Sequence, residues 1–140
     1  MLTIYPACFF HDEDGYSVMF PDLNYLSTCG KTLEEALEMA VDCLAGYIHT
    51  CQVDGDTIPN PSSIQSIDIE KYAKEYDTSP NDIFVNLVSV DVEEYAKKHF
   101  EKAVKKTLTI PAWLNAAALE RNVNFSQVLQ DALKEIVKAQ

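Results

Sequence analysis

Residues 2–10 are mainly apolar and are typical of a β-strand, and residues 16–20 place Tyr16, Val18 and Phe20 on one face with the period of two of a strand. These two stretches lie on either side of an acidic turn that ends in Gly15, so they predict a hairpin. Pro6 cannot donate a backbone hydrogen bond, which favours an edge position or a bulge for the first strand. Residues 25–29 predict a third short strand.

The pattern then changes to the period of a helix. Thr32 and Glu35 have the spacing of a capping box, and apolar residues recur every three or four positions until about Asp54. Residues 56–66 are rich in proline and serine and predict a loop, whereas residues 69–76 fit no single element.

Residues 83–90 form a nearly continuous apolar run, as expected for a strand that is central or covered on both faces. Asp91 and Glu94 then predict the N-cap of a helix over roughly residues 92–103. The resulting order of strands and helices, β-β-β-α-β-α, predicts an α+β domain whose sheet is covered by helices.

The C-terminal segment begins with a second alternating stretch, residues 105–111. Leu108 and Ile110 share one face of this predicted strand. The other face is polar and carries Lys105, Thr107 and Thr109. Pro111 suits the first turn of a following helix, which is predicted over residues 111–121.

A second helix follows in this segment. Asn122 is placed to end the first helix in the left-handed conformation, and Asn124 with Gln127 predicts the cap of the second. One strand and two short helices are too small to be stable alone. We therefore expect a two-fold homodimer with paired antiparallel strands, and this two-stranded ribbon would fit the major groove of DNA.

The order strand, proline, helix, turn and capped helix resembles the ribbon-helix-helix repressors of the Arc/MetJ type. The resemblance implies that the ribbon residues Lys105, Thr107 and Thr109 contact DNA. The start of the second helix, with Asn124 and Ser126, is expected to bind a phosphate. This chain has Asn122 where the family usually has glycine, which is a mild departure because asparagine tolerates the left-handed conformation.

The sign of the net charge changes close to the start of this C-terminal segment. Residues 1–96 hold 3 basic and 18 acidic residues, a net charge of −15, whereas residues 97–140 hold 8 basic and 4 acidic residues, a net charge of +4. We place the boundary near residues 98–104, which gives domains 1–103 and 104–140. A tail of +4 beside a −15 body predicts weak DNA binding by a lone dimer, so we expect two or more dimers, such as a tetramer, or a bound basic partner.

The N-terminal body resembles HicB-type antitoxins through three stretches of sequence. These stretches are Gly15-Tyr16-Ser17-Val18 with Phe20-Pro21-Asp22-Leu23, then Thr32-Leu33-Glu34-Glu35-Ala36, then Ile58-Pro59-Asn60-Pro61-Ser62. The resemblance implies a partial RNase H-like fold that neutralises a small basic RNA-cleaving toxin of the HicA type. It also implies that the C-terminal ribbon-helix-helix domain represses the shared operon by binding operator DNA.

Acidic side chains could occupy the basic surface with which such a toxin binds RNA. The candidate toxin-binding residues are Asp12, Glu13, Asp14, Tyr16 and Asp22. Two alternatives remain open: a stand-alone ribbon-helix-helix transcription factor with a ligand-sensing acidic domain, and an active or degenerate nuclease. Catalysis of the RNase H type needs several carboxylates around two metal ions, and the first three candidates lie in a turn, so we expect no enzyme activity, no metal and no cofactor.

The four cysteines are Cys8, Cys29, Cys43 and Cys51, and none of their spacings suits a zinc site. We expect reduced, buried thiols, with Cys43 and Cys51 two turns apart on one helix. No apolar run is long enough to span a membrane, and the N-terminus lacks the basic start of a secretory signal. A cytoplasmic location without membrane contact is therefore expected.

Overall fold

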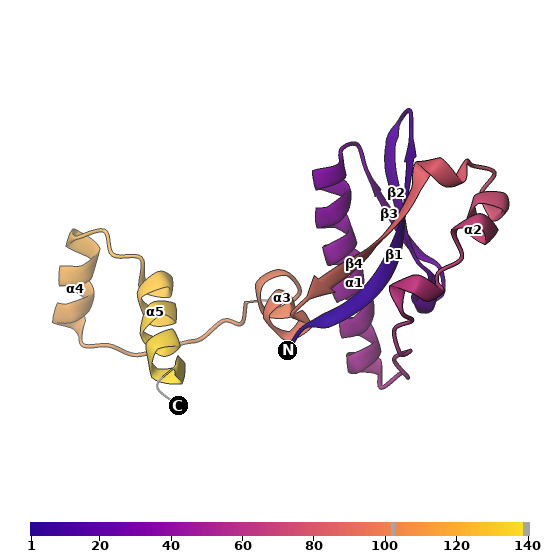
Figure 1. The fold of residues 1–140 in the computed structure, drawn as a ribbon. Coiled ribbons are helices and arrows are strands. Elements are labelled where there is room, and N and C mark those ends of the chain that lie inside the picture. Colours follow the sequence, from indigo (N-terminus) through magenta and orange to yellow (C-terminus); the bar gives the residue numbers. More distant parts are fainter. Residues whose placement is uncertain (102, 139–140) are drawn as a thin grey trace. The chain divides into compact units, whose positions relative to one another are not determined.

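The computed structural model describes residues 1–101 and 103–138. The chain divides into two compact units, Met1–Lys102 and Ala103–Gln140, which we call the acidic unit and the tail unit (Figure 1). With these bounds the acidic unit holds 6 basic and 19 acidic residues, a net charge of −13, and the tail unit holds 5 basic and 3 acidic residues, a net charge of +2. The structure is of the mixed α+β class, as predicted.

The acidic unit is built on a four-stranded sheet with the order β3-β2-β1-β4, in which all neighbouring strands are antiparallel. The strands are β1 (Thr3–Asp12), β2 (Gly15–Phe20), β3 (Leu26–Gly30) and β4 (Ile83–Val90). Val18 and Phe20 are fully buried on one face and Tyr16 packs against the same core, which confirms the alternation predicted for β2. The 3-10 turn η1 (Pro21–Leu23) connects β2 to β3.

The prediction that Pro6 marks an edge strand or a bulge was wrong. Strand β1 is central, with β2 on one side and β4 on the other. Pro6 pairs with Leu87 of β4, whereas pairing with β2 begins only at Cys8. Proline is accepted here because β2 does not extend far enough to need a backbone N–H from this part of β1.

Of the two alternatives predicted for residues 83–90, the central position was wrong, whereas both faces of the strand do contribute to a core: Val88 and Val90 to the core with α1, and Ile83 to the core with α2. Strand β4 is the last strand of the sheet, and its burial is irregular along its length. Phe84 is 39% exposed and Leu87 is 50% exposed. Apolar content alone cannot distinguish a central strand from an edge strand covered by helices, because it does not tell whether a further strand pairs with it.

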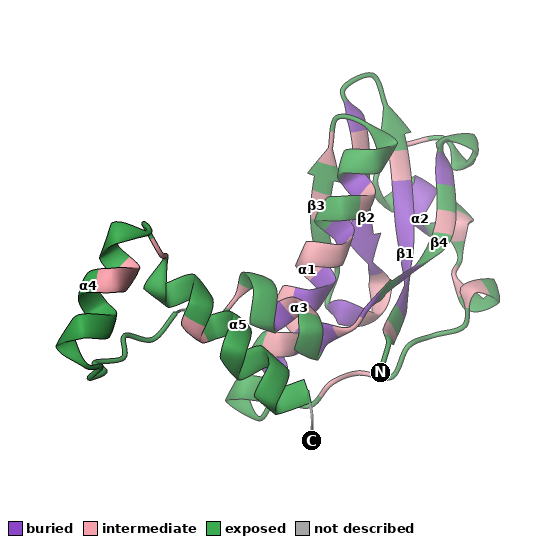
Figure 2. Cartoon of the chain, turned by 90° about the vertical axis from the view of Figure 1, so that its left-hand side faces the viewer, coloured by how far each residue is buried: buried purple, intermediate pink, exposed green. Residues whose placement is uncertain are grey.

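Helix α1 (Leu33–Asp54) covers one face of the sheet (Figure 2). Thr32 caps it by accepting a hydrogen bond from the N–H of Glu35 at 3.1 Å, as predicted. The Glu35 carboxylate accepts from the N–H of Lys31 at 3.2 Å and not from that of Thr32, so the reciprocal bond of the box is displaced by one residue. The helix ends at Gly55, which has φ 72°.

The largest core lies between α1 and the sheet. Its helix residues are small or aliphatic and include Ala36, Ala40, Leu44 and Ile48, and they pack against aromatic side chains of β1 and β2. Phe9, Phe20, Leu23 and Leu44 are fully buried. Each side chain of this size contributes about 1.5–3 kcal/mol when it leaves water.

The opposite face of the sheet is partly covered by helix α2 (Ile69–Glu75), in the region that the sequence left open. Asp68 caps this helix by accepting from the N–H of Lys71 at 3.1 Å. Tyr72 and Ala73 pack with Cys8, Met19 and Ile83 in a second, smaller core. The turns η2 (Ile64–Ser66) and η3 (Pro80–Asp82) flank α2, so the order of the main elements is β-β-β-α-α-β-α, one helix more than predicted.

Helix α3 (Val92–His99) is shorter than the predicted helix over residues 92–103. Asp91 caps its start, as predicted, by accepting from the N–H of Glu94 at 3.2 Å. At the other end, the N–H groups of Phe100 and Glu101 both donate to the carbonyl of Ala96, and the helix ends there. Phe100 then packs against the main core. Residue 102 of the predicted helix lies outside the described residues.

The tail unit contains helices α4 (Ala112–Glu120) and α5 (Phe125–Lys138), close to the two predicted helices. Asn122 has φ 52°, which confirms the left-handed position between them. Asn124 caps α5 by accepting from the N–H of Gln127 at 3.1 Å, but the Gln127 amide donates to Asp131 at 2.8 Å. The reciprocal bond that the sequence suggested is therefore not made.

Candidate functional site

Three of the predicted acidic site residues lie together at the tip of the β1–β2 hairpin. Asp12 is the last residue of β1, Gly15 is the first of β2, and the side chains of Asp12, Glu13 and Asp14 are exposed. The Asp12 carboxylate accepts a hydrogen bond from the N–H of Asp14 at 2.8 Å, which orders the turn. The tip therefore presents a fixed group of negative charge to solvent.

An aromatic pair lies directly behind this tip. His11 and Tyr16 face each other across the hairpin, and their rings stack with centroids 4.5 Å apart and an angle of 21° between their planes. The sequence singled out Tyr16 but missed His11. The register of the predicted hairpin could have identified it, because a turn at residues 13–14 places these two side chains opposite each other.

A shallow hollow of about 360 Å³ adjoins the acidic tip. Asp12, Asp14 and Tyr16 line one part of it, while Lys31 and Glu35 line the part near the start of α1. Gly15 allows this close approach, because a Cβ atom there would lie 2.5 Å from the carbonyl oxygen of Gly30 and φ is 135°. A side chain at this position would force the hairpin away from β3.

Asp22 does not belong to this group, although the sequence included it. It lies in η1, beyond the other end of β2, about 20 Å of strand away from the hairpin tip. Its carboxylate accepts two hydrogen bonds from Ser62, one from the N–H at 2.8 Å and one from the hydroxyl at 2.5 Å. Tyr5 donates its hydroxyl to the carbonyl of Pro59 nearby. The geometry gives Asp22 a role in holding the loop after α1 in place.

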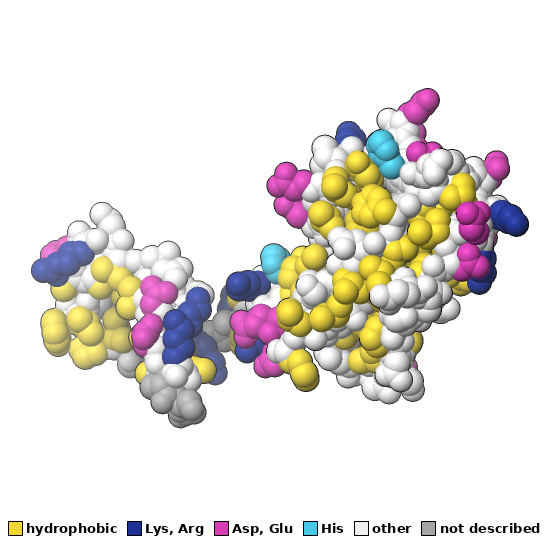
Figure 3. Space-filling model, viewed as in Figure 1, with side chains coloured by type: hydrophobic (Ala, Val, Ile, Leu, Met, Phe, Trp, Pro, Cys, Tyr) yellow, Lys and Arg dark blue, Asp and Glu magenta, His cyan; other side chains and the backbone are white. Residues whose placement is uncertain are grey.

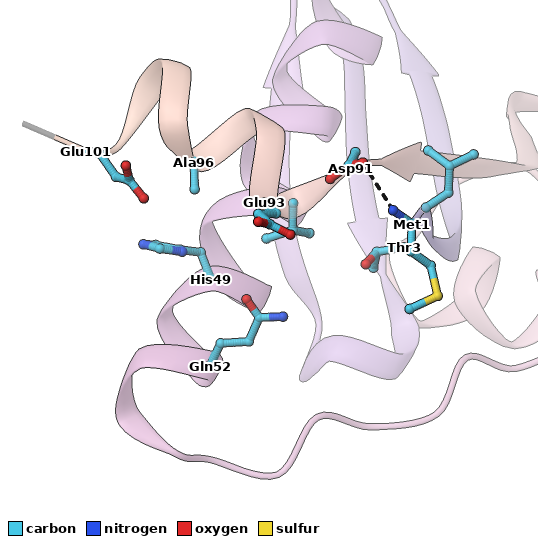
Figure 4. A pocket seen from close by; sticks show the side chains of 10 residues that line it. Met1, Thr3, His49, Gln52, Asp91, Glu93, Ala96 and Glu101 are labelled. Atoms are coloured by element: carbon cyan, nitrogen blue, oxygen red, sulfur yellow. Dashed lines mark hydrogen bonds and ion pairs between the residues drawn. The ribbon is translucent and has the colours of Figure 1, made fainter. Parts of the chain in front are cut away.

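A larger hollow of about 460 Å³ lies where the chain begins (Figure 4). The N-terminal amine of Met1 forms an ion pair with Asp91 at 3.2 Å, and His49 and Gln52 of α1 border the same hollow. The Glu94 N–H and this amine hold the pKa of Asp91 below its ordinary value. Because the Asp91 carboxylate is already paired, it is not a free anionic group of this hollow.

The tail unit has a groove of about 660 Å³ with a mainly apolar lining. Its walls come from the segment before α4 and from both helices, and they include Leu108, Ile110, Leu114, Phe125, Val128 and Leu129. No residue described between 103 and 138 is buried, and the apolar surface remains open (Figures 2 and 3). A unit that buries none of its apolar residues cannot hold its fold by its own core.

The polar residues predicted to contact DNA lie on the other side of the segment before α4. Lys106, Leu108 and Ile110 line the groove, whereas Lys105, Thr107 and Thr109 do not. This division follows the alternation that the sequence predicted. The residues between 103 and 111 nevertheless form no strand in the single chain, contrary to the predicted strand over residues 105–111. The physical reason is that a lone extended segment has no ladder partner within its own unit.

The two remaining DNA-binding candidates lie at the start of α5. The side chain of Asn124 is used as the helix cap. Ser126 is exposed but also borders the apolar groove, together with Phe125. The first turn of α5 therefore meets both the groove and solvent.

Among the described residues, no group of three or more His, Cys, Asp or Glu side chains is arranged to hold a metal ion. Cys8 and Cys51 are buried as expected, and burial raises the pKa of the Cys8 thiol to about 11. Cys29, however, is exposed and Cys43 is half-buried, so the expectation of four buried thiols was wrong for these two. Cys29 is exposed because it lies on the edge strand β3, on the face that α1 does not cover. No helix in the part of the chain that the structure describes is long and apolar enough to cross a membrane.

Comparison with known proteins shows a match to one family over most of the chain. The model of the HicB_like antitoxin of bacterial toxin-antitoxin systems matches residues 5–133. A solved toxin–antitoxin complex from Streptococcus pneumoniae contains a chain that is 35% identical, with a TM-score of 0.62. That similarity covers 96% of this chain and 99% of the other.

Two curated relatives come from Photorhabdus laumondii. Antitoxin HicB 2 is 48% identical over 59 residues, which is 42% of each chain. Antitoxin HicB 1 is 43% identical over 53 residues, which is 38% of this chain and 34% of the relative. The matched region thus spans less than half of the length of these curated relatives.

Proposed function

The chain belongs to the HicB-like family of antitoxins of bacterial toxin–antitoxin systems, and from this premise we propose that it joins two activities in one molecule. The acidic unit binds and neutralises a small, basic, RNA-cleaving toxin of the HicA type. The tail unit dimerises as a ribbon-helix-helix domain and represses the operon by binding its operator. The chain is a binding protein and not an enzyme in this proposal.

The observation that carries the proposal is the division of charge between two separate units. The acidic unit has a net charge of −13 and the tail unit one of +2. A toxin that binds RNA needs a positively charged surface, to which the acidic unit is complementary. The same charge would repel DNA, so the DNA contact falls to the tail unit.

We assign the toxin contact to the hairpin tip, with Asp12, Glu13, Asp14 and Tyr16. The first three carboxylates are exposed and close together, and the ring of Tyr16 stacks behind them on His11. We assign Asp22 to positioning the loop, since each of its oxygens accepts a hydrogen bond from Ser62 and it lies at the other end of β2. The partial RNase H-like description of the acidic unit is part of the same proposal and rests on its order of strands and helices.

We assign dimerisation to the apolar groove of the tail unit. Its occupant is the same segment of a second copy, because two extended segments can then pair as antiparallel strands around a two-fold axis. In that dimer Leu108 and Ile110 face the shared core, while Lys105, Thr107 and Thr109 are displayed twice on the outer face for the major groove. Asn124 and Ser126, at the start of α5, are placed for a phosphate.

The modest charge of the tail unit affects the stoichiometry. A unit of +2 joined to one of −13 binds DNA weakly as a single dimer. Repression therefore requires two dimers on adjacent half-sites, or a bound toxin that offsets the negative charge. We expect the complex with toxin to bind the operator more tightly than the free antitoxin does.

The toxin contact is tested by co-expressing the full chain with the small basic protein encoded by the neighbouring gene. We expect a complex in pull-down and loss of the partner's RNA cleavage. The double variant Asp12→Lys/Asp14→Lys should slow association at low salt by about tenfold or more. Glu38→Lys/Asp54→Lys makes the same change of charge on α1 and is the matched control. Equal effects of the two double variants would rule out the hairpin tip as the contact.

The DNA contact is tested by a mobility shift with the DNA upstream of the same operon. Lys105→Ala should weaken binding to all sequences and reduce the salt slope by about 1. Thr107→Ala or Thr109→Ala should change the preference among operator sequences by about 1–3 kcal/mol per lost base contact. Unchanged DNA binding by a chain that lacks residues 103–140 would refute the assignment.

A further inference from the structure

Strand β4 is an open edge of the sheet. It is eight residues long, its sequence is IFVNLVSV, and it contains no charged residue, no proline and no glycine. Its pairing with β1 runs without interruption from Thr3 with Val90 to Phe10 with Ile83, so no bulge disturbs it. Natural edge strands usually carry a charge, a proline or a bulge that prevents another strand from pairing with them. None of these features is present on β4.

Beyond its first residue, the outer side of β4 has no hydrogen-bond partner within the described residues. Alternate residues of an edge strand direct their backbone N–H and C=O groups away from the sheet. The turn η2 lies beside β4, and the N–H of Ile83, the first residue of the strand, donates to the carbonyl of Pro80 in η3. No described segment outside the sheet forms a hydrogen bond to residues 84–90. The other edge strand, β3, has only five residues, and the carbonyl of Ser27 there accepts a weak bond from the thiol of Cys43.

Two apolar side chains border this open edge on its two faces. Phe84 lies on the face that α1 covers and stacks on Phe9 with ring centroids 4.9 Å apart. Leu87 lies on the opposite face, beside Pro6. They are 39% and 50% exposed, so a strand added to β4 would gain apolar contacts on both of its faces as well as backbone hydrogen bonds.

We propose that β4 takes up an extended segment of the basic toxin as a fifth strand of the sheet, an inference that rests on the proposed antitoxin function. Carboxylates lie at both ends of the strand: Asp82 precedes it, and Glu93 follows it at the start of α3, beside Asp91, which is paired with the Met1 amine. The acidic hairpin tip is close to the first end, because Phe10, two residues before Asp12, pairs with Ile83. The segment that fits is about six to eight residues long, apolar at alternate positions and flanked by Lys or Arg.

Charge also argues against a second copy of this chain at the same edge. Pairing β4 with β4 would bring together two units that each carry a net charge of −13. In a two-fold antiparallel arrangement, Asp82 of each copy would lie at the same end as Asp91 of the other. Like charges opposite each other destabilise a strand pair, whereas a basic strand places opposite charges at both ends.

The direct test is hydrogen–deuterium exchange on the full chain, alone and in complex with the basic protein encoded by the neighbouring gene. The outward-facing amides of β4 should exchange rapidly in the free chain and at least about tenfold more slowly in the complex. Side-chain contacts alone would leave these backbone amides unprotected.

Three variants add a second readout in the same complex. Leu87→Lys places a positive charge beside the incoming basic strand and should weaken binding about tenfold or more. Leu87→Glu removes the same apolar contact but adds the opposite charge, so it should weaken binding less. Val53→Lys makes an equivalent change on an exposed residue near the end of α1 and should have little effect.

The possible outcomes separate this inference from the function on which it rests. If the complex forms while the β4 amides remain unprotected, the strand addition is wrong and the antitoxin function stands. If no complex forms, the proposed function fails and the strand addition fails with it. If the free chain alone protects β4 increasingly with its own concentration, a second copy occupies the edge and the proposal is overturned.

Discussion

The carboxylate of Asp22 accepts two hydrogen bonds from Ser62, across 40 residues of sequence, at 2.8 Å from the N–H and at 2.5 Å from the hydroxyl. This pair fastens the proline- and serine-rich loop after α1 to the turn after β2. A residue that composition assigned to a binding surface thus has a structural role.

Asp22→Ala should therefore lower the free energy of unfolding by about 1–2 kcal/mol, because hydrogen bonds to a charged group are stronger than neutral ones. Ser62→Ala removes only the bond from the hydroxyl and keeps the bond from the backbone N–H, so it should lower the free energy of unfolding by less. Urea denaturation of the two single variants and the double variant measures their coupling. Additive effects in this cycle would show that the pair does not act as a unit.

Gly30 lies where β3 approaches the first turn of α1. A Cβ atom there would lie 2.4 Å from the backbone N of Ala36, and backbone atoms cannot move aside easily. We expect Gly30→Ala to destabilise the chain by about 1–3 kcal/mol. Gly46→Ala is the matched control within α1, where the nearest atom is the Cζ of Phe100 at 3.8 Å. Gly46→Ala should raise the free energy of unfolding by about 0.5–1 kcal/mol, because alanine lowers the backbone entropy of the unfolded chain. Thermal unfolding that shifts in the same direction for both variants would contradict this account.

Tyr95 of α3 donates its hydroxyl to Asp42 of α1 at 2.8 Å. Burial, with the hydrogen bond and the negative charge of Asp42, raises the pKa of Tyr95 from 10.0 to about 12. A raised pKa in the folded state means that this stabilisation is fully present below pH 10 and is lost as the pH rises from 10 through 12.

Tyr95→Phe removes this hydrogen bond and should lower the free energy of unfolding by about 0.5–1.5 kcal/mol at neutral pH. It should also reduce the loss of stability between pH 10 and 12 relative to the unmodified chain. Urea denaturation at several alkaline pH values provides the comparison. Parallel pH profiles for the two proteins would show that Tyr95 titrates alike in the folded and unfolded states.

The two faces of the segment before α4 can be separated by mutation. Leu108 lines the apolar groove and is 62% exposed in the single chain, so Leu108→Ser should weaken self-association. Two copies each lose a leucine contact of about 1.5–3 kcal/mol, which corresponds to at least about a 100-fold rise in the dimer dissociation constant. Analytical ultracentrifugation measures this change.

Thr109 lies on the opposite face and does not line the groove. Thr109→Ala should leave the dimer intact and change only the preference for operator sequence. The assignment of the two faces would be wrong if Thr109→Ala dissociated the dimer, or if Leu108→Ser left it intact.

Several features of the fold were predictable from the sequence because they depend on local interactions. The capped start of α1 at Thr32, its end at Gly55 and the left-handed Asn122 are each set by a few neighbouring residues. The hairpin at Gly15 follows in the same way from alternation and turn chemistry. The family resemblance seen in the sequence was confirmed by the match over residues 5–133.

Other features depend on contacts between distant segments, which local patterns do not encode. The central position of Pro6, the edge position of β4 and the bonds between Asp22 and Ser62 each involve partners 40 or more residues away along the chain. Helix α2 is stabilised by the second core, which assembles only when β1, β2 and β4 are side by side.

The sequence by itself therefore determined most of the capped helices and the hairpin, the division of charge and the family of this protein. Only the tertiary structure decided which strand lies at the edge, which carboxylates are free and which face of the tail segment meets the groove. The physical reason is that propensity and capping act over a few residues, whereas burial and strand pairing depend on which distant segments meet.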